Sequence, residues 1–126
     1  MSQSQVRTYA AQARSTDTFG RVLCTARNHH FVVDGPVQNG CPGEAVNPGE
    51  LFLAGVAACG VELVQVIAKE RQVTPSAIAV DIEGMMDRSR PVRPDVSLFN
   101  SVALRFRLSG VTQAQAEDLI DRFRAR

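Results

Sequence analysis

The stretch that decides the fold is residues 47–60, which read NPGELFLAGVAACG. Asn47 is a favoured helix N-cap and Pro48 suits the first helical position. Glu50 stands where the carboxylate of a capping box reaches back to the N–H of the cap residue. Every residue from 51 to 61 is apolar or glycine. A helix with this pattern has no polar face, so we expect it to be covered on all sides.

The predicted helix continues to about Gln72, shortly before Pro75. At 1.5 Å per residue it is about 35–40 Å long, which exceeds what one small domain buries unless Gly60 kinks the helix. Several residues of the run are small enough to let another backbone approach closely: Ala54, Gly55, Ala57, Ala58 and Gly60. A second copy of the chain is the simplest cover for the excess, and we therefore predict a homodimer.

Length and composition exclude several classes of protein. The 126 residues suffice for one domain with a single core, so we take 1–126 as one domain. A net charge of +1 gives no basis for binding nucleic acid or an anionic membrane. The polar N-terminus lacks the apolar segment of a signal peptide. The apolar run is also too short to span a bilayer, because Glu62 and Gln65 interrupt its continuation. These observations predict a cytoplasmic protein.

The segments around the central helix predict β-strands. Before it we expect three short strands, at about 6–14, 19–27 and 30–33, with turns at 15–18, 28–29 and 34–36. After it we expect two strands whose inner faces carry Ile78, Val80, Ile82, Val102, Leu104, Phe106 and Leu108. A capping box of Thr112 and Gln115 opens the last helix. The order βββ-α-ββ-α predicts an α+β fold.

Three cysteines, Cys24, Cys41 and Cys59, have no metal-type spacing, and the chain has no CxxC or HxxxH pattern. A reducing compartment disfavours disulfides. His29 and His30 are adjacent, and adjacent residues on a strand point to opposite faces. We therefore predict no metal site and at least one free, redox-active thiol.

The stretch 47–60 resembles the active-helix motif of the OsmC/Ohr family, the osmotically inducible and organic-hydroperoxide-resistance proteins. The resemblance rests on the Asn-Pro cap, the Leu- and Ala-rich helix and the cysteine at this spacing. Upstream, residues 30–36, HFVVDGP, are similar to the end of a strand in the broader OsmC-like members. The resemblance implies a tightly intertwined homodimer in which two central helices are buried against the sheets.

The resemblance also implies an activity, the thiol-dependent reduction of hydroperoxides, preferably organic ones, in antioxidant defence. A cysteine thiolate attacks the O–O bond and becomes a sulfenic acid. A second cysteine condenses with it, and an external dithiol restores the pair, so no bound cofactor is expected. By its position in the motif, Cys59 is the attacking residue.

The sequence departs from the family pattern at two places. Family members carry a glutamate directly after Asn-Pro, where this chain has Gly49. The acid comes one residue later, and nine positions at about 100° each place Glu50 opposite Cys59, so we expect Glu50 to act as a cap. Family peroxidases also carry a resolving cysteine after the last helix, and no cysteine follows Cys59 here. Cys41 is either a substitute partner or simply a loop thiol.

Activation of Cys59 requires a group that the sequence does not identify. The residue lies nearly three turns into the helix, beyond the reach of the macrodipole, so a lowered thiol pKa needs a cation. Arg21 and Arg14 are both candidates. Glu62 would raise the thiol pKa if it were buried and unpaired. Otherwise it points to solvent or to a cation.

The sequence supports two functional hypotheses. The first is a hydroperoxide reductase centred on Cys59. The second is a non-catalytic protein that binds a small apolar ligand in the dimer crevice, with Cys59 only a small hydrophobe in a helix core. The displaced glutamate and the missing distal cysteine motivate the second hypothesis.

Overall fold

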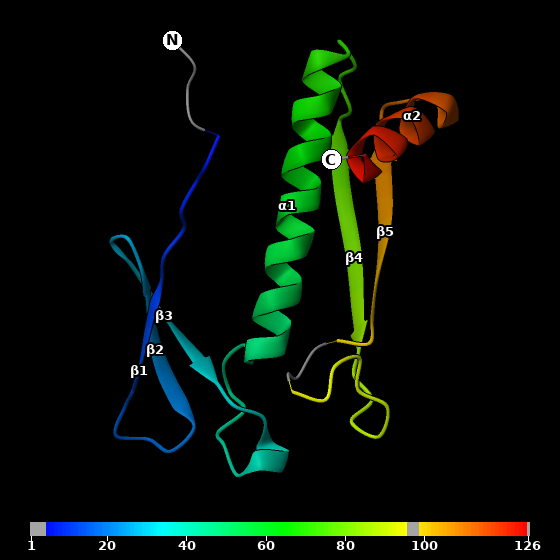
Figure 1. The fold of residues 1–126 in the computed structure, drawn as a ribbon. Helices are drawn as coiled ribbons and strands as arrows, with labels where there is room; N and C mark the ends of the chain where they lie inside the picture. The colour runs from blue at the N-terminus through cyan, green and yellow to red at the C-terminus, as the bar shows by residue number, and fades with distance from the viewer. Residues whose placement is uncertain (1–4, 96–98, 126) are drawn as a thin grey trace. The chain divides into compact units, whose positions relative to one another are not determined.

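The computed structural model describes residues 5–95 and 99–125 (Figure 1). The elements in chain order are β1 (Gln12–Ser15), β2 (Arg21–Ala26), β3 (His29–Asp34), the 3₁₀ turn η1 (Val37–Asn39), α1 (Pro48–Glu70), β4 (Ala77–Met85), β5 (Ser101–Ser109) and α2 (Gln113–Arg124). This order confirms the predicted α+β class. The chain divides into two compact units, an N-terminal unit of residues 1–51 and a C-terminal unit of residues 52–126.

The N-terminal unit is built on an antiparallel sheet in the order β1-β2-β3. The turn between β2 and β3 falls at Arg27 and Asn28, with Arg27 at a φ of +53°. It lies one residue earlier than predicted, and the register that results pairs Arg21 with Asp34 across the strands. The first strand begins only at residue 12 instead of 6, since residues 5–11 are exposed and belong to no strand. Their alternation is weak, and no apolar face ties them to the sheet.

The start of α1 has the predicted capping box. The Glu50 backbone N–H donates to Asn47 Oδ1 at 2.8 Å, and the Asn47 N–H donates to Glu50 Oε1 at 3.0 Å. Because Glu50 is held in this reciprocal pair, its role as a cap is confirmed.

The end of α1 is a Schellman motif with an unusual residue at its left-handed position. Gln72 has a φ of +57°. The Val73 N–H donates to the carbonyl of Ala68 at 2.9 Å, and the Gln72 N–H donates to the carbonyl of Lys69 at 3.2 Å. Glycine is the usual residue here because a Cβ makes the left-handed conformation costly.

Replacing Gln72 with glycine should stabilise the protein. Glycine removes the Cβ penalty at a positive φ, and this gain exceeds the entropy that glycine adds to the unfolded chain, so we expect the free energy of unfolding to rise by about 0.5 kcal/mol. Urea denaturation measures the change, with Gln72→Ala as the matched control, since alanine keeps the Cβ. A loss of stability in Gln72→Gly would contradict this account of the helix end.

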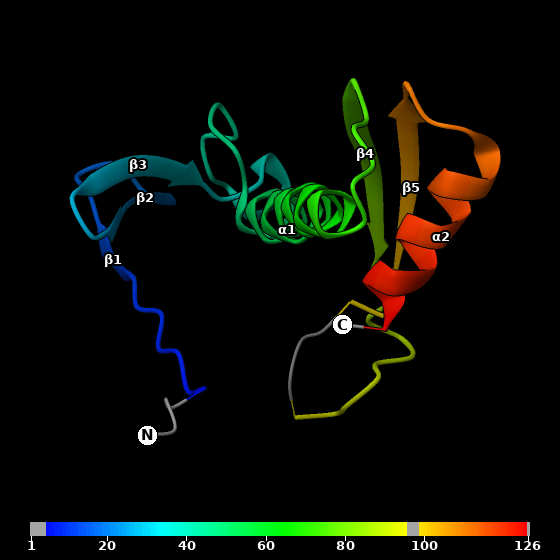
Figure 2. The same ribbon diagram turned by 90° about the horizontal axis from the view of Figure 1, so that it is seen from above.

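The C-terminal unit holds the hydrophobic core. β4 and β5 are antiparallel, in a register that pairs Ile78 with Leu108, Val80 with Phe106 and Ile82 with Leu104. The inward faces predicted for these strands therefore lie together. In both ribbon views α2 lies next to β5 (Figures 1 and 2). The capping box of α2 is confirmed, with the Gln115 N–H donating to Thr112 Oγ1 at 3.1 Å and the Thr112 N–H to Gln115 Oε1 at 2.9 Å. The buried residues of the unit's hydrophobic cluster are Val64, Ile67, Ala68 and Leu119.

Within the C-terminal unit, only one face of α1 is covered by other elements. Gly60, Val64, Ile67 and Ala68 are its buried residues, whereas Phe52 is 56% exposed. The cover of its other face, predicted to come from a second copy of the chain, stays a prediction. The argument that the run is too short for a bilayer was wrong, because α1 reaches 23 residues with a mean hydropathy of 2.1 over its most apolar window. By length and composition alone it could cross a membrane, a property that the core helix of a soluble protein shares.

Candidate active site

Cys59 lies on the open face of α1. The next residue, Gly60, is buried on the other side, where an added Cβ would come within 3.2 Å of the Phe106 ring. Cys59 itself is exposed and forms no disulfide. The thiol therefore does not lie in a closed helix core within one chain, and its predicted cover by a second copy stays a prediction. Within the C-terminal unit the thiol is accessible from the side of α1 opposite the core.

The surroundings of Cys59 on this face are apolar and roomy. Gly55 lies one turn before Cys59, and nothing comes within 4 Å of a Cβ built on it. Phe52 lies two turns before Cys59 and stacks on Phe99, with ring centroids 5.7 Å apart. Helical side chains lean toward the N-terminus, so the Cys59 sulfur leans over the turn that contains Gly55. An apolar molecule can therefore approach the sulfur along this face.

In the N-terminal unit, a buried carboxylate holds an arginine. Arg21 Nε donates to Asp34 Oδ1 at 2.8 Å, and Arg21 Nη2 donates to Asp34 Oδ2 at 2.9 Å. Asp34 is completely buried and also accepts the backbone N–H groups of Glu44 and Ala45, at 3.0 and 2.9 Å. A second carboxylate, that of the exposed Glu44, accepts from Arg21 Nη2 at 3.1 Å.

The pKa values of the pair follow from these contacts. The hydrogen bonds from Arg21, with help from the two backbone N–H groups, hold the pKa of Asp34 well below its usual range despite burial. The hydrogen bonds to Asp34 and then to Glu44 raise the pKa of Arg21 further above its already high value. The pair is therefore fully ionised at neutral pH.

This cluster fixes the loop that leads into α1. Asp34 binds the chain at Glu44 and Ala45 through its side chain, and its own N–H donates to the carbonyl of Val46 at 3.1 Å. Two of the three guanidinium nitrogens of Arg21 are occupied within the unit. Arg21, one of the two predicted partners of Cys59, thus already serves two carboxylates. The other candidate, Arg14 on β1, makes no hydrogen bond or ion pair within the described part of the chain.

The low pKa of Asp34 predicts that its carboxyl stays ionised when the pH is lowered. A carboxyl whose pKa is lower in the folded state contributes stability above its unfolded pKa of about 3.9 and loses that contribution as the pH falls toward the folded value. We therefore expect the carboxyl carbon resonance of Asp34 to stay at its ionised position at about pH 4, where a free aspartate is about half protonated. An NMR titration measures this, and a midpoint near that pH would contradict the described geometry.

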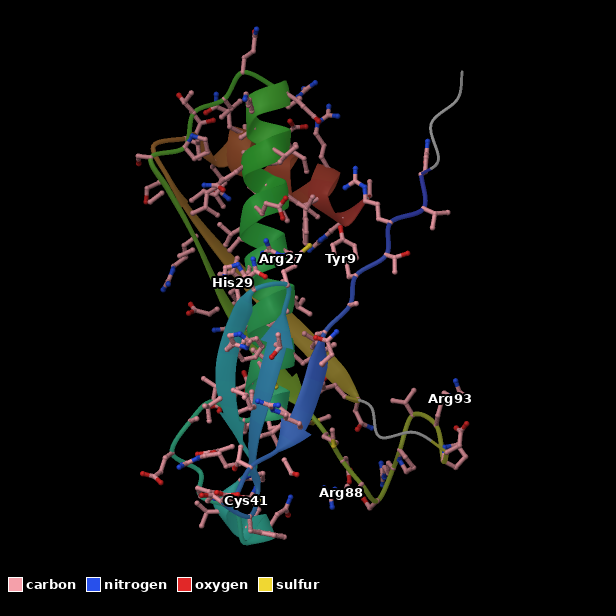
Figure 3. The ribbon with its side chains drawn as sticks, turned by 90° about the vertical axis from the view of Figure 1, so that its left-hand side faces the viewer. Tyr9, Arg27, His29, Cys41, Arg88 and Arg93 are labelled. Carbon is pink, nitrogen blue, oxygen red and sulfur yellow. The ribbon has the colours of Figure 1, made fainter. Side chains whose placement is uncertain are left out.

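The other two cysteines lie in the N-terminal unit. Cys41 is half-buried and packs over two glycines, so that a Cβ added to Gly20 or Gly35 would collide with its sulfur. Its thiol points to the carbonyl of Asn39 at 3.8 Å. In Figure 3 Cys41 lies at the end of the sheet away from the β2–β3 turn. Cys24 is half-buried on β2. Cys41 is therefore a packed side chain, and its predicted alternative role as a resolving thiol stays a prediction.

Within residues 5–95 and 99–125, no group of three or more His, Cys, Asp or Glu side chains is arranged to hold a metal ion. His30 Nδ1 instead lies 3.0 Å from Thr25 Oγ1 on the neighbouring strand.

The sequence did not predict the Arg21–Asp34 pair. The feature that could have predicted it is the register of the β2–β3 hairpin. A turn centred on Arg27 and Asn28 places residues 21 and 34 opposite one another. With the turn placed one residue later, the two residues are not partners.

Comparisons with known proteins supply the family. Residues 41–126 match the OsmC family model, described as OsmC-like protein. No curated protein matches the chain. An OsmC-like protein from Mycoplasma pneumoniae has a TM-score of 0.80 at 16% identity, covering 95% of this chain and 82% of that one. The organic hydroperoxide resistance protein OsmC of Legionella pneumophila has a TM-score of 0.70 at 25% identity, covering 97% and 85%.

A third solved structure is the organic hydroperoxide resistance protein of Elizabethkingia anophelis, with thiocyanate bound. It has a TM-score of 0.75 at 22% identity, covering 98% of this chain and 85% of that one. The matched model spans more than half of the chain, and these structures share its fold over nearly its whole length. The chain therefore belongs to the OsmC family.

Proposed function

We propose that this protein is a cysteine-dependent reductase of organic hydroperoxides, with Cys59 as the attacking thiolate. The observation that carries the proposal is the exposure of Cys59 on an open apolar face of α1, at the position of the thiol in the family motif. Two similar proteins, from Legionella pneumophila and Elizabethkingia anophelis, are organic hydroperoxide resistance proteins. Family membership and the site's chemistry thus point to the same class of substrate.

The reaction begins at the sulfur. The Cys59 thiolate attacks the outer oxygen of the hydroperoxide, the O–O bond breaks, and the leaving alkoxide takes a proton to become the alcohol. Cys59 is then a sulfenic acid, oxidised by two electrons. An external dithiol reduces it: one thiol forms a mixed disulfide with loss of water, and the second thiol displaces Cys59. The apolar face around Gly55 and Phe52 favours a substrate with an organic group over hydrogen peroxide.

The open face of α1 supports a homodimer. Leu51, Phe52 and Val66 are between 38 and 56% exposed in the single chain. Apolar side chains gathered on one face of a helix call for a cover. A second copy of the chain is our proposed cover, and the crevice between the copies would then hold the substrate. Under this proposal α1 is the core helix of the assembled protein.

The test is an assay of the purified protein with cumene hydroperoxide and a dithiol. We expect peroxide consumption above that of the dithiol alone, and slower consumption of hydrogen peroxide. Intact mass after oxidant without dithiol should show one added oxygen at Cys59. If cumene hydroperoxide is lost no faster than in buffer with dithiol, the reductase proposal fails.

The second hypothesis, a non-catalytic protein that binds an apolar ligand, has one observation in its favour. Arg21 already donates to Asp34 and Glu44 through Nε and Nη2, so only part of its guanidinium remains to activate a thiol. This hypothesis expects a fluorescent apolar probe to bind at the open face, and Cys59 to react with peroxide no faster than a free cysteine. Faster reaction would reject it.

A further inference from the structure

The loop that joins β4 to β5 carries basic and apolar side chains next to one another. Residues 86–95 of this loop read MDRSRPVRPD. Arg88 and Arg90 are exposed, and so are the apolar side chains of Met86 and Val92. In Figure 1 the loop lies beyond the ends of β4 and β5, and Figure 3 labels Arg88 and Arg93 on it. We call residues 86–95 the arginine loop.

The side chain of Asn100 holds the first turn of the arginine loop in place. The Asp87 N–H donates to Asn100 Oδ1 at 2.8 Å, and Asn100 Nδ2 donates to the carbonyl of Arg90 at 2.6 Å. The Arg90 N–H donates to the carbonyl of Asp87 at 3.2 Å, which closes the turn, and the Asn100 N–H donates to the carbonyl of Met85 at 2.7 Å. The turn is therefore tied to the ends of both strands while its arginine side chains point away from any partner.

The carboxylates of the arginine loop leave two of its arginines unpaired. Asp87 Oδ1 accepts from the backbone N–H and the hydroxyl of the serine within the turn, at 3.0 and 2.6 Å. Arg93 donates to the two carboxylate oxygens of Asp95, at 3.2 and 2.9 Å. The side chains of Arg88 and Arg90 make no hydrogen bond or ion pair within residues 5–95 and 99–125. Two guanidinium groups are thus available to an anionic partner.

The base of the arginine loop is anchored beside the open face of α1. Phe99, next to the clamping asparagine, stacks on Phe52. It also packs over Gly84 at the end of β4, where an added Cβ would come within 2.8 Å of the Phe99 ring. Phe52 and Cys59 lie on the same face of the helix, two turns apart. A partner bound to the loop therefore lies at the Phe52 end of this face.

The chemistry of the arginine loop fits an anionic lipid surface. Arginines near such a surface are attracted to its headgroups, and neighbouring apolar side chains gain free energy by leaving water for the boundary between headgroups and acyl chains. A small anion in solution would bind the guanidinium groups but leave Met86 and Val92 in water. The net charge of +1 for the whole chain does not predict this site, because the attraction depends on cations within about 10 Å of the surface.

We propose that the arginine loop docks this protein on anionic lipid bilayers, with Arg88 and Arg90 on the headgroups and Met86 and Val92 between them. This inference goes beyond the reductase activity and does not depend on it. The two are compatible, because apolar hydroperoxides partition into bilayers, and docking would hold the open face of α1 near this source of substrate.

Vesicle co-sedimentation of the whole protein tests the electrostatic part of the proposal. We expect binding to phosphatidylcholine vesicles that contain phosphatidylglycerol, and much weaker binding to phosphatidylcholine alone. Each arginine at an anionic surface contributes about fivefold in affinity, so Arg88→Gln combined with Arg90→Gln should weaken binding at least about tenfold. Arg105→Gln combined with Arg124→Gln removes the same charge from exposed positions on β5 and α2, and binding should stay within about twofold.

Three outcomes would overturn the docking role of the loop. The first is no binding to the anionic vesicles, and the second is an equal loss of binding in the two double variants. The third is binding to a DNA duplex, but not to vesicles, that depends on Arg88 and Arg90, since this would assign the loop to nucleic acid.

A fluorescent reporter tests the apolar part. The chain contains no tryptophan, so Val92→Trp introduces a single indole into the loop. Its emission should shift to shorter wavelength when anionic vesicles are added, whereas Tyr9→Trp, at an exposed position of the N-terminal unit, should show no shift. An unshifted emission for Val92→Trp would mean that the loop does not enter the lipid surface. Neither measurement requires peroxide turnover, so an inactive enzyme would reject the proposed function and leave the docking result unaffected.

Discussion

Cys59→Ser should abolish hydroperoxide consumption, with the rate of cumene hydroperoxide loss falling at least about a hundredfold. A serine hydroxyl is almost entirely protonated at neutral pH and is a poor nucleophile toward the O–O bond, so the first chemical step is lost. The substitution itself should fold normally, because Cys59 is exposed in the chain and forms no disulfide. The peroxide assay with dithiol measures the effect, and circular dichroism checks the fold.

Two matched controls separate the reacting thiol from the other cysteines. Cys24→Ala and Cys41→Ala change thiols that are half-buried in the N-terminal unit. Both should keep turnover within about twofold of the wild type if neither thiol takes part. A large loss of turnover in Cys41→Ala, together with a Cys41–Cys59 disulfide in peroxide-treated wild type, would instead make Cys41 the resolving residue. Full activity in Cys59→Ser would reject the proposed mechanism.

The local features of the fold were predictable from the sequence. Capping boxes join residues three apart, so Asn47 with Glu50 and Thr112 with Gln115 identify the starts of both helices. The inward faces of β4 and β5 follow from strict alternation, which has a period of two. The first strand was placed inaccurately because its segment shows no such alternation.

The candidate site was less predictable, because it depends on contacts that local sequence does not encode. Arg21 and Asp34 are 13 residues apart, and their pairing depends on the turn at Arg27 and Asn28. If that turn is predicted one residue away, Arg21 and Asp34 are no longer opposite one another and the pair is not predicted. The exposure of Cys59 follows from its place on the face of α1 away from the buried residues Gly60, Val64 and Ile67, which an apolar run by itself does not reveal.

Arg21 was a candidate partner of the thiol from the sequence, and the structure pairs it with carboxylates instead. This difference has a consequence for stability, since Asp34 is completely buried and binds four donors: two nitrogens of Arg21 and the N–H groups of Glu44 and Ala45. A carboxylate with this set of partners is a structural centre of the N-terminal unit. Removing its charge weakens its bonds to all four donors at once.

Asp34→Asn should therefore lower the Tm by more than about 10 °C. The asparagine amide keeps one acceptor oxygen but turns an NH₂ toward donors, and the guanidinium of Arg21 loses its buried counter-charge. Glu44→Gln is the matched control. Its carboxylate is 78% exposed, so the loss of that ion pair should shift the Tm by no more than about 2 °C.

Hydrogen exchange localises the effect of Asp34→Asn. The Glu44 and Ala45 amides donate to Asp34, so their protection should fall in Asp34→Asn and persist in Glu44→Gln. Because the loop they occupy leads directly into Asn47, loosening it should also speed exchange at Glu50, whose N–H donates to that cap. Exchange in the core around Val64 and Leu119 should change far less. An unchanged Tm and unchanged protection at Glu44 would mean that Asp34 does not anchor the loop, and Arg21 would then be free to serve Cys59.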